Sequence, residues 1–265
     1  MGGPVVGGFC DSLGSTCACL RRVCCRGGVR GPGNGVGDAD CVPRMEAQKV
    51  TQSDEDETIE LARIAFERGA YRRAERLLLQ AIEHGDLGDD VWNNLGTVRV
   101  MIDDYAGAVA AYANSSSLGV DSLANLGLAY ERLGDIPGAF AKYEEALTLD
   151  PDHVSSLVNL GTLLLSEDRV EEAQAVLLHA ADLDPSANWQ LSDVYIELGD
   201  LDSSSEALHH AIAAGERRGW LDLARVEHDR GNRSEAELAF AEAIAYLRAE
   251  IVTGQVMLGS RGGLG

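Results

Sequence analysis

Apolar residues recur along most of the chain at the three-to-four-residue spacing of amphipathic helices. Between about residues 55 and 250, this spacing and the glycines that interrupt it predict six pairs of helices. Gly69, Gly134, Gly199 and Gly231 are predicted to end first helices, because the residue after a helix often adopts a left-handed backbone that glycine tolerates. The predicted pairs are 55–68/71–83, 89–101/105–117, 121–133/137–149, 153–165/169–182, 187–198/202–214 and 217–230/234–251.

The six pairs repeat the same residue types in register. Each first helix contains a leucine, namely Leu61, Leu95, Leu126, Leu160, Leu191 and Leu223, and a small residue follows each, namely Ala62, Gly96, Gly127, Gly161, Ser192 and Ala224. Each second helix carries a small residue, then a large apolar residue, then another small one. These columns are Ala74, Ala108, Ala139, Ala173, Ser204 and Ala236; Leu78, Tyr112, Tyr143, Leu177, Leu208 and Phe240; and Ala81, Ser115, Ala146, Ala180, Ala211 and Ala243.

Small residues in fixed columns indicate helices that pack closely, with the leucines and aromatic residues filling the remaining gaps. We therefore expect Ala139→Leu to destabilise the fold far more than the exposed change Glu144→Ala. The small residues that follow the leucines are spaced by 34, 31, 34, 31 and 32 residues. About one helical turn is missing from the short units, so regular curvature is expected to be interrupted around residues 115–123 and 182–190.

The repeated residues resemble the signature of the tetratricopeptide repeat family. Trp92, Leu95 and Gly96, followed by Ala108 and Tyr112, carry the resemblance. Other units supply further matches, including Leu126, Gly127, Tyr130, Ala139, Tyr143 and Pro151, then Leu160, Gly161, Ala173 and Pro185, and finally Trp220, Leu223, Ala224, Ala236 and Phe240. The resemblance implies an all-α solenoid of about six stacked antiparallel helix pairs over residues 54–251, a right-handed superhelix whose concave face is lined by first helices.

The charge balance narrows the classes of partner. The chain carries 22 Lys and Arg against 43 Asp and Glu, a net charge of −21, which repels nucleic acids and anionic lipid surfaces. No apolar stretch is long enough to span a bilayer, and the N-terminus lacks the order of features of an export signal. We therefore expect a cytoplasmic protein that binds neither nucleic acid nor membrane.

Residues 1–45 differ in composition from the rest of the chain. All six cysteines lie there, namely Cys10, Cys17, Cys19, Cys24, Cys25 and Cys41, within a Gly- and Arg-rich stretch without hydrophobic periodicity. Such a composition predicts disorder, and the native polypeptide is expected to begin at Met45. The tail 252–265 is likewise predicted to be disordered. The cysteine spacing does not match a zinc or thioredoxin-like motif, although a redox- or metal-responsive role remains an alternative.

No catalytic constellation is found in the sequence. The glycine-rich segment 31–37 lacks dinucleotide-binding spacing, and neither Lys49 nor Lys142 lies in a phosphate-loop context. The six histidines include no pair at the four-residue spacing of a zinc-binding helix. We predict no enzyme activity, no cofactor and no metal site.

Polar residues directly before the leucine column are the candidate peptide-binding residues. The resemblance places this position in the concave groove, where asparagines commonly hold the main chain of an extended peptide. The candidates are Asn94, Asn125, Asn159 and Gln190, with Asp90, Asp121, Glu131 and Asp193 selecting the charge of the peptide. We expect the asparagines to face solvent, so that their triple replacement by alanine weakens binding severely and barely changes stability.

The sequence therefore predicts a non-catalytic scaffold that binds a neutral or basic extended segment of a partner protein. A self-associating structural protein is the second hypothesis, because residues 252–265 contain no obvious polar capping helix and an uncapped solenoid end exposes apolar surface. This hypothesis predicts a homo-oligomer formed through the repeat ends.

Overall fold

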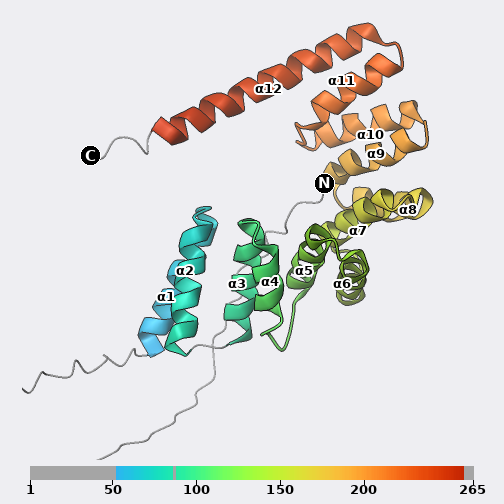
Figure 1. Ribbon diagram of the computed structural model, residues 1–265. Helices are drawn as coiled ribbons and strands as arrows, with labels where there is room; N and C mark the ends of the chain where they lie inside the picture. The colour runs from blue at the N-terminus through green and yellow to red at the C-terminus, as the bar shows by residue number, and fades with distance from the viewer. Residues whose placement is uncertain (1–51, 86–87, 260–265) are drawn as a thin grey trace, which may run out of the picture.

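The computed structural model describes residues 52–85 and 88–259, and all regular secondary structure within these ranges is helical (Figure 1). The first three pairs are α1 (Gln52–Glu67) and α2 (Tyr71–His84), α3 (Asp89–Met101) and α4 (Tyr105–Tyr112), and α5 (Val120–Leu133) and α6 (Ile136–Leu149). The others are α7 (Val154–Ser166) and α8 (Val170–Leu183), α9 (Asn188–Glu197) and α10 (Leu201–Ala213), and α11 (Gly219–Asp229) and α12 (Arg233–Gly259). A short 3₁₀ turn, η1 (Pro185–Ala187), precedes α9. The predicted all-α solenoid is confirmed.

The helix pairs stack side by side into an arc (Figure 1). Each second helix packs against the first helix of its own pair, and every second helix before α12 also packs against the first helix of the next pair. First helices also contact one another along the row α3, α5, α7 and α9, whereas successive second helices in the described ranges make at most marginal contact. The first helices therefore lie on the inner side of the bend, and the second helices fan out on the outer side.

The leucine column and the large apolar column meet where successive repeats join. Leu78 lies in one buried cluster with Leu95, Tyr112 with Leu126, Tyr143 with Leu160, Leu177 with Leu191, and Leu208 with Leu223. Two members of the columns do not follow the prediction, because Leu61 is 38% exposed and Phe240 is 43% exposed. Leu61 lies in the first repeat of the described residues and Phe240 in the last, so each has a described neighbouring repeat on one side only.

Close approach of the two helices of a pair explains the small residues after the leucines. A Cβ atom added to Gly96 would lie 2.5 Å from the Tyr112 ring, and one added to Gly127 would lie 2.6 Å from the Tyr143 ring. These glycines are required because the aromatic side chain of the second helix lies directly on the backbone of the first.

Ala139 has the burial that its column predicts, with no exposed surface, whereas Glu144 is exposed. A leucine in place of Ala139 must displace close-packed neighbours, so we expect Ala139→Leu to cost about 1–3 kcal/mol of stability. Glu144→Ala should remain within about 0.5 kcal/mol of the wild type. Chemical denaturation of both variants is the measurement. Equal midpoints would show that Ala139 does not lie in a packed interface.

The helix ends agree with the glycine prediction and extend it. Gly69, Gly134, Gly199 and Gly231 have φ angles of 69°, 83°, 73° and 83°. In the second and fourth repeats, Asp103 and Asp168 hold the same left-handed conformation, which aspartate tolerates better than most residues. Second helices then begin with an aspartate N-cap in three repeats, where Asp104, Asp135 and Asp200 accept hydrogen bonds from backbone N–H groups three residues ahead.

The short repeats lose helix in two different ways. The predicted second helix 105–117 ends at Tyr112, so Ser115 lies outside the helix and is only partly buried. Asp89 at the start of α3 fixes the shortened connection by accepting hydrogen bonds from the Ser116 N–H at 2.7 Å and from its Oγ at 2.5 Å. Between α8 and α9, η1 replaces the missing helical turn.

The C-terminal helix is longer than the sequence predicts. Helix α12 continues to Gly259, so the prediction of a disordered tail over 252–265 is wrong for residues up to 259. The N-terminal segment 1–45 with its cysteines and the predicted start at Met45 lie outside the described residues, as do residues 260–265.

Candidate functional site

The three candidate asparagines lie between first helices rather than on an open surface. Asn94, Asn125 and Asn159 are 4%, 0% and 2% exposed, so the prediction that they face solvent is wrong. The physical reason is the direct packing of α3 on α5 and of α5 on α7, which encloses side chains on the inner flank of each helix. These residues therefore affect stability as well as any binding.

The four candidate carboxamides fall into two classes by their hydrogen bonds. Asn93, the residue before Asn94, is buried as well; its Nδ2 donates to the carbonyl of Ser117 at 3.0 Å and its Oδ1 has no partner among the described residues. The Nδ2 atoms of Asn94 and Asn159 and the Oε1 atom of Gln190 are buried without a partner among the described residues. Asn125, by contrast, hydrogen-bonds with the hydroxyl of Tyr112. Because almost all buried polar groups in proteins are paired, unpaired atoms in the second, fourth and fifth repeats need an explanation.

Stability measurements on alanine variants can separate the two classes. Removing a buried unpartnered donor relieves its desolvation cost, and alanine is a better helix former than asparagine, so Asn94→Ala and Asn159→Ala should each raise stability by about 1 kcal/mol. Asn125→Ala should lower stability by about 1 kcal/mol, because it leaves the buried Tyr112 hydroxyl with one partner fewer. Thermal unfolding of the three variants is the test, and changes of the same sign in all three would contradict the classes.

Two of the candidate acidic residues are engaged with neighbouring side chains. Asp121 lies 3.0 Å from Nε2 of His153, which joins the starts of α5 and α7. Glu131 accepts a hydrogen bond from the hydroxyl of Tyr143 at 3.0 Å, and burial, followed by the charge of Glu131, raises the pKa of Tyr143 far above its ordinary value. Asp90 is partly buried at the start of α3.

Asp193 belongs to a charged cluster at the fifth and sixth repeats. Burial, and next the negative charge of Asp222, raise the pKa of Asp193 above its ordinary value. Asp222 accepts a hydrogen bond from the indole N–H of Trp189 at 2.8 Å, and the guanidinium of Arg218 lies 4.4 Å from the centre of the Trp189 ring. Asp222 also forms an ion pair with Arg225 at 3.5 Å, and the remaining negative charge of the two carboxylates favours a further cation.

Sequence reasoning missed one partly buried and one fully buried charge that share one register position, four residues after the leucine column. This position holds Arg99 in the second repeat and Glu227 in the sixth. Arg99 donates to the carbonyl of Gly107 at 2.9 Å, and Glu227 has no exposed surface. The sequence contains a signal for this position, because other repeats have a large apolar or aromatic residue where these two have a charge. Those residues are Tyr130, Leu164 and Tyr195.

Ser156, His153 and Asp121 have the side-chain types of a hydrolytic triad, but the serine hydroxyl is not accessible to a substrate. His153 lies 2.8 Å from Oγ of Ser156 through Nδ1 and 3.0 Å from Asp121 through Nε2. Ser156 has no exposed surface, so its hydroxyl cannot reach a substrate. The three residues serve to fix the start of α7 against α5.

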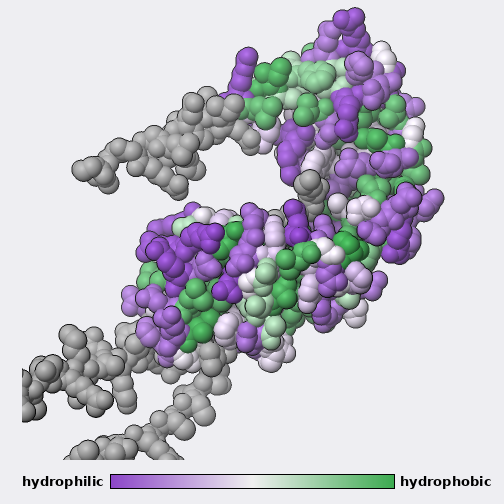
Figure 2. Space-filling view, viewed as in Figure 1, coloured by the Kyte–Doolittle hydropathy of each residue, from purple (hydrophilic) through white to green (hydrophobic). Residues whose placement is uncertain are grey.

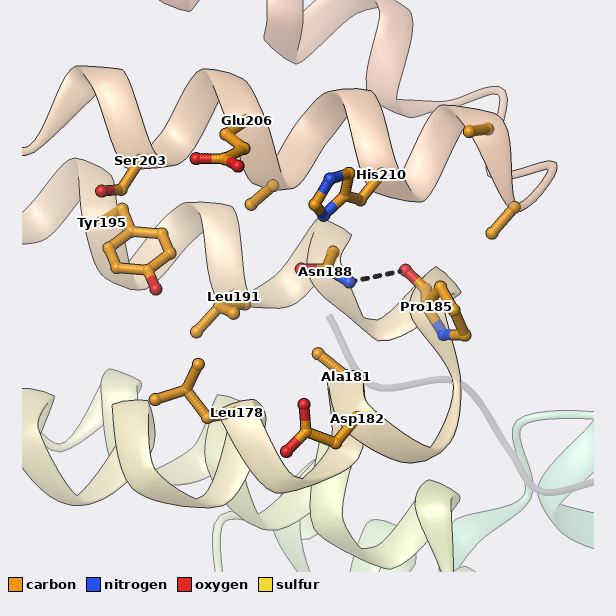
Figure 3. A pocket seen from close by; sticks show the side chains of 13 residues that line it. Leu178, Ala181, Asp182, Pro185, Asn188, Leu191, Tyr195, Ser203, Glu206 and His210 are labelled. Carbon is orange, nitrogen blue, oxygen red and sulfur yellow. Dashed lines mark hydrogen bonds between the residues drawn. The ribbon is translucent and has the colours of Figure 1, made fainter.

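A pocket of about 640 Å³ opens on the outer side, between α8, α9 and α10 (Figure 3). Leu178 and Leu191 form the apolar part of the pocket wall. Around them lie Asp182 of α8 and, from the opposite side, Glu206 and His210 of α10 (Figure 3). The pocket adjoins η1, where Asn188 donates to the carbonyl of Pro185 at 3.0 Å. None of its lining side chains is among the buried unpartnered groups of the described ranges, in contrast to the inner face.

Within residues 52–85 and 88–259, no cluster of three or more His, Cys, Asp or Glu side chains is arranged to hold a metal ion. None of the described helices combines the length and the apolar character needed to cross a membrane.

Sequence comparison identifies the repeats. Family models described as tetratricopeptide repeat match residues 59–116, 132–190 and 185–214, which together make up more than half of the chain. The chain therefore belongs to the tetratricopeptide repeat family, a class of helical solenoids that present extended surfaces for binding other proteins. Comparison with curated proteins returned no match.

Solved structures show the same fold at low sequence identity. The chain is similar to a structure of the APC/C hetero-tetramer Cut9–Hcn1, with a TM-score of 0.64 and 15% identity over 72% of this chain, and it spans 39% of that protein. It is also similar to a thermophilic TPR protein of Thermus thermophilus, TTC0263, with a TM-score of 0.53 and 18% identity over 69% of this chain and 99% of that one. YrrB, a TPR protein with an unusual peptide-binding site, gives a TM-score of 0.50 and 19% identity over 63% of this chain and 90% of that one.

Proposed function

We propose that this chain is a non-catalytic scaffold that binds an extended, neutral or basic segment of a partner protein along the inner face formed by α3, α5, α7 and α9. The observation that carries the proposal is the set of buried, unpartnered carboxamide atoms of Asn94, Asn159 and Gln190 on that row of helices. Each unpaired buried group costs about 1–3 kcal/mol, and a bound main chain would supply the missing partners once the carboxamides turn toward the groove, because the atoms are enclosed in the free chain.

The chemistry of the unpartnered atoms fits a peptide main chain. Asn94 and Asn159 offer N–H donors to peptide carbonyls, and Gln190 offers an acceptor to a peptide N–H. Such contacts do not depend on peptide side chains. Asn125 is excluded from this role because it already hydrogen-bonds with the hydroxyl of Tyr112. The groove would therefore present unpartnered carboxamide atoms in the second, fourth and fifth repeats and none from Asn125 in the third.

The acidic residues would then set the charge preference. Asp90 at the start of α3 and the coupled pair Asp193 and Asp222 at the far repeats favour a segment with Lys or Arg near its ends. A cation beside Asp193 would offset the burial and the repulsion from Asp222 that together raise its pKa. YrrB offers a precedent only in that this fold can hold a peptide, as its description states for that protein.

Peptides selected from a random display library on the full chain would test the proposal, with affinities measured by titration calorimetry. We expect selected peptides to be basic, and the double variant Asn94→Ala, Asn159→Ala to bind them about 10-fold more weakly or worse, because two hydrogen bonds of about 0.5–1.5 kcal/mol each are lost. Asn114→Ala is the matched control, since its exposed carboxamide bonds the carbonyl of Ala110 on the outer side.

Asp193→Asn tests the charge preference separately. This variant should weaken binding of basic peptides with little dependence on salt, because Asp193 is partly buried and partly buried charges are screened much less than exposed ones. Unchanged affinity of the double asparagine variant, with an intact fold, would move the binding site away from the inner face, and the outer pocket beside η1 would be the next candidate.

A further inference from the structure

Every junction between successive repeats uses the same pair of side chains. The large apolar residue of one second helix shares a buried cluster with the leucine of the next first helix, as Leu78 does with Leu95 and Leu208 with Leu223. At these five junctions the leucines are at most 8% exposed and the large apolar residues at most 2%. The stacking surface is therefore one interface repeated five times.

Each end of the solenoid presents one half of this interface. Leu61 on α1 is 38% exposed and lies in the first repeat of the described residues, while Phe240 on α12 is 43% exposed and lies in the last. Ile244 and Leu247 continue the apolar stripe along α12, at 49% and 50% exposure, with the four- and three-residue steps that keep side chains on one helix face. Hydrophobic surface is visible on the arm formed by α11 and α12 (Figure 2).

We propose that copies of this chain associate head to tail, with the apolar stripe of α12 in one copy packing against α1 of a second copy. Phe240 would contact Leu61 of the second copy and so form a sixth junction of the kind found five times within the chain. A second copy is the occupant that the structure favours, because the two unmatched halves belong to one interface and lie at opposite ends of one molecule.

The symmetry of such a contact has a measurable consequence. The two surfaces differ, so the contact is heterologous, and each copy retains a free surface at its other end. Association therefore continues beyond a dimer, into open chains or a closed ring. A contact between two α12 stripes would instead use the same surface twice and stop at a dimer.

Analytical ultracentrifugation of the full chain across a concentration series tests the proposal. We expect the average mass to rise with concentration and to exceed twice the monomer mass. Leu61→Asp and Phe240→Asp, each replacing an exposed side chain, should be folded by circular dichroism and monomeric when studied alone. Leu133→Asp is the matched control, because Leu133 is a 50% exposed leucine at the end of α5, far along the chain from both ends.

Mixing the two end variants gives the decisive result. Phe240→Asp retains an intact α1 surface and Leu61→Asp an intact α12 surface, so an equal mixture should form a species of twice the monomer mass and nothing larger. A monomeric wild type at every concentration would overturn the proposal. So would a Leu61→Asp variant that dimerises alone, which would indicate contact between α12 stripes. The Asn94→Ala, Asn159→Ala variant should associate like the wild type, so this result is independent of the proposed peptide groove.

Discussion

Replacing Glu227 with alanine is expected to lower the free energy of unfolding by about 3–5 kcal/mol. The carboxylate of Glu227 is fully buried and accepts hydrogen bonds from Ser205 at 2.5 Å, Arg230 at 2.5 Å and Asn232 at 2.7 Å. It thereby joins α10, α11 and the turn before α12. Removing it leaves three donors without their acceptor, and the Arg230 guanidinium retains only Asp202 as a charged partner among the described residues.

Glu237→Ala is the matched control for this change. Glu237 forms an ion pair with Arg233 within α12, but its side chain is 69% exposed, and exposed pairs contribute little to stability. Chemical denaturation followed by circular dichroism would measure both variants. Similar midpoints for Glu227→Ala and Glu237→Ala would show that the Glu227 network does not stabilise the last repeats.

The same network predicts a dependence of stability on pH. Burial by itself raises the pKa of Glu227, but hydrogen bonds from Ser205, Asn232 and Arg230 outweigh it, so the pKa lies below its ordinary value of 4.5. The unfolded chain therefore binds this proton more readily than the folded chain does. The contribution is full above about pH 4.5 and is lost as the pH falls through the lowered pKa of Glu227. Glu227→Gln should show a correspondingly smaller loss of stability on acidification.

Tyr143→Ala is the second change for which we expect a loss of about 3–5 kcal/mol, because it empties a fully buried aromatic site. The ring packs on the backbone of Gly127, and its hydroxyl bonds to Glu131. Phe240 holds the same register position in the last repeat but is 43% exposed, so Phe240→Ala should cost much less. Thermal unfolding at a concentration where the chain is monomeric compares the two, and equal losses would show that repeat stacking does not determine the burial of this column.

Much of the fold could be predicted because its rules are local. The three-to-four-residue spacing placed each helix, and glycine identified four of the left-handed helix ends. Asp103 and Asp168 escaped the prediction because aspartate in that conformation has no distinctive signature. The second helix of the second repeat was predicted too long for a similar reason, since the hydrogen bonds from Ser116 to Asp89 connect residues far apart in the sequence.

The candidate site was predicted in position but not in environment. Counting back from the leucine column located Asn94, Asn125 and Asn159 on successive first helices, and the prediction that they bind a peptide remains to be tested. Their burial and the separate role of Asn125 depend on how closely α3, α5 and α7 approach, which no single helix specifies.

The sequence by itself determined the helix pairs, the repeated columns and the family, because each follows from residue spacing within about thirty residues. Only the tertiary structure decided which members of a column are buried. Leu61 and Phe240 match their columns in type, yet both are exposed, because burial in a solenoid requires a neighbour on each side and the first and last described repeats each have one described neighbour. Glu227 shows the converse, since a charged side chain is buried there by partners from α10, the end of α11 and the turn before α12.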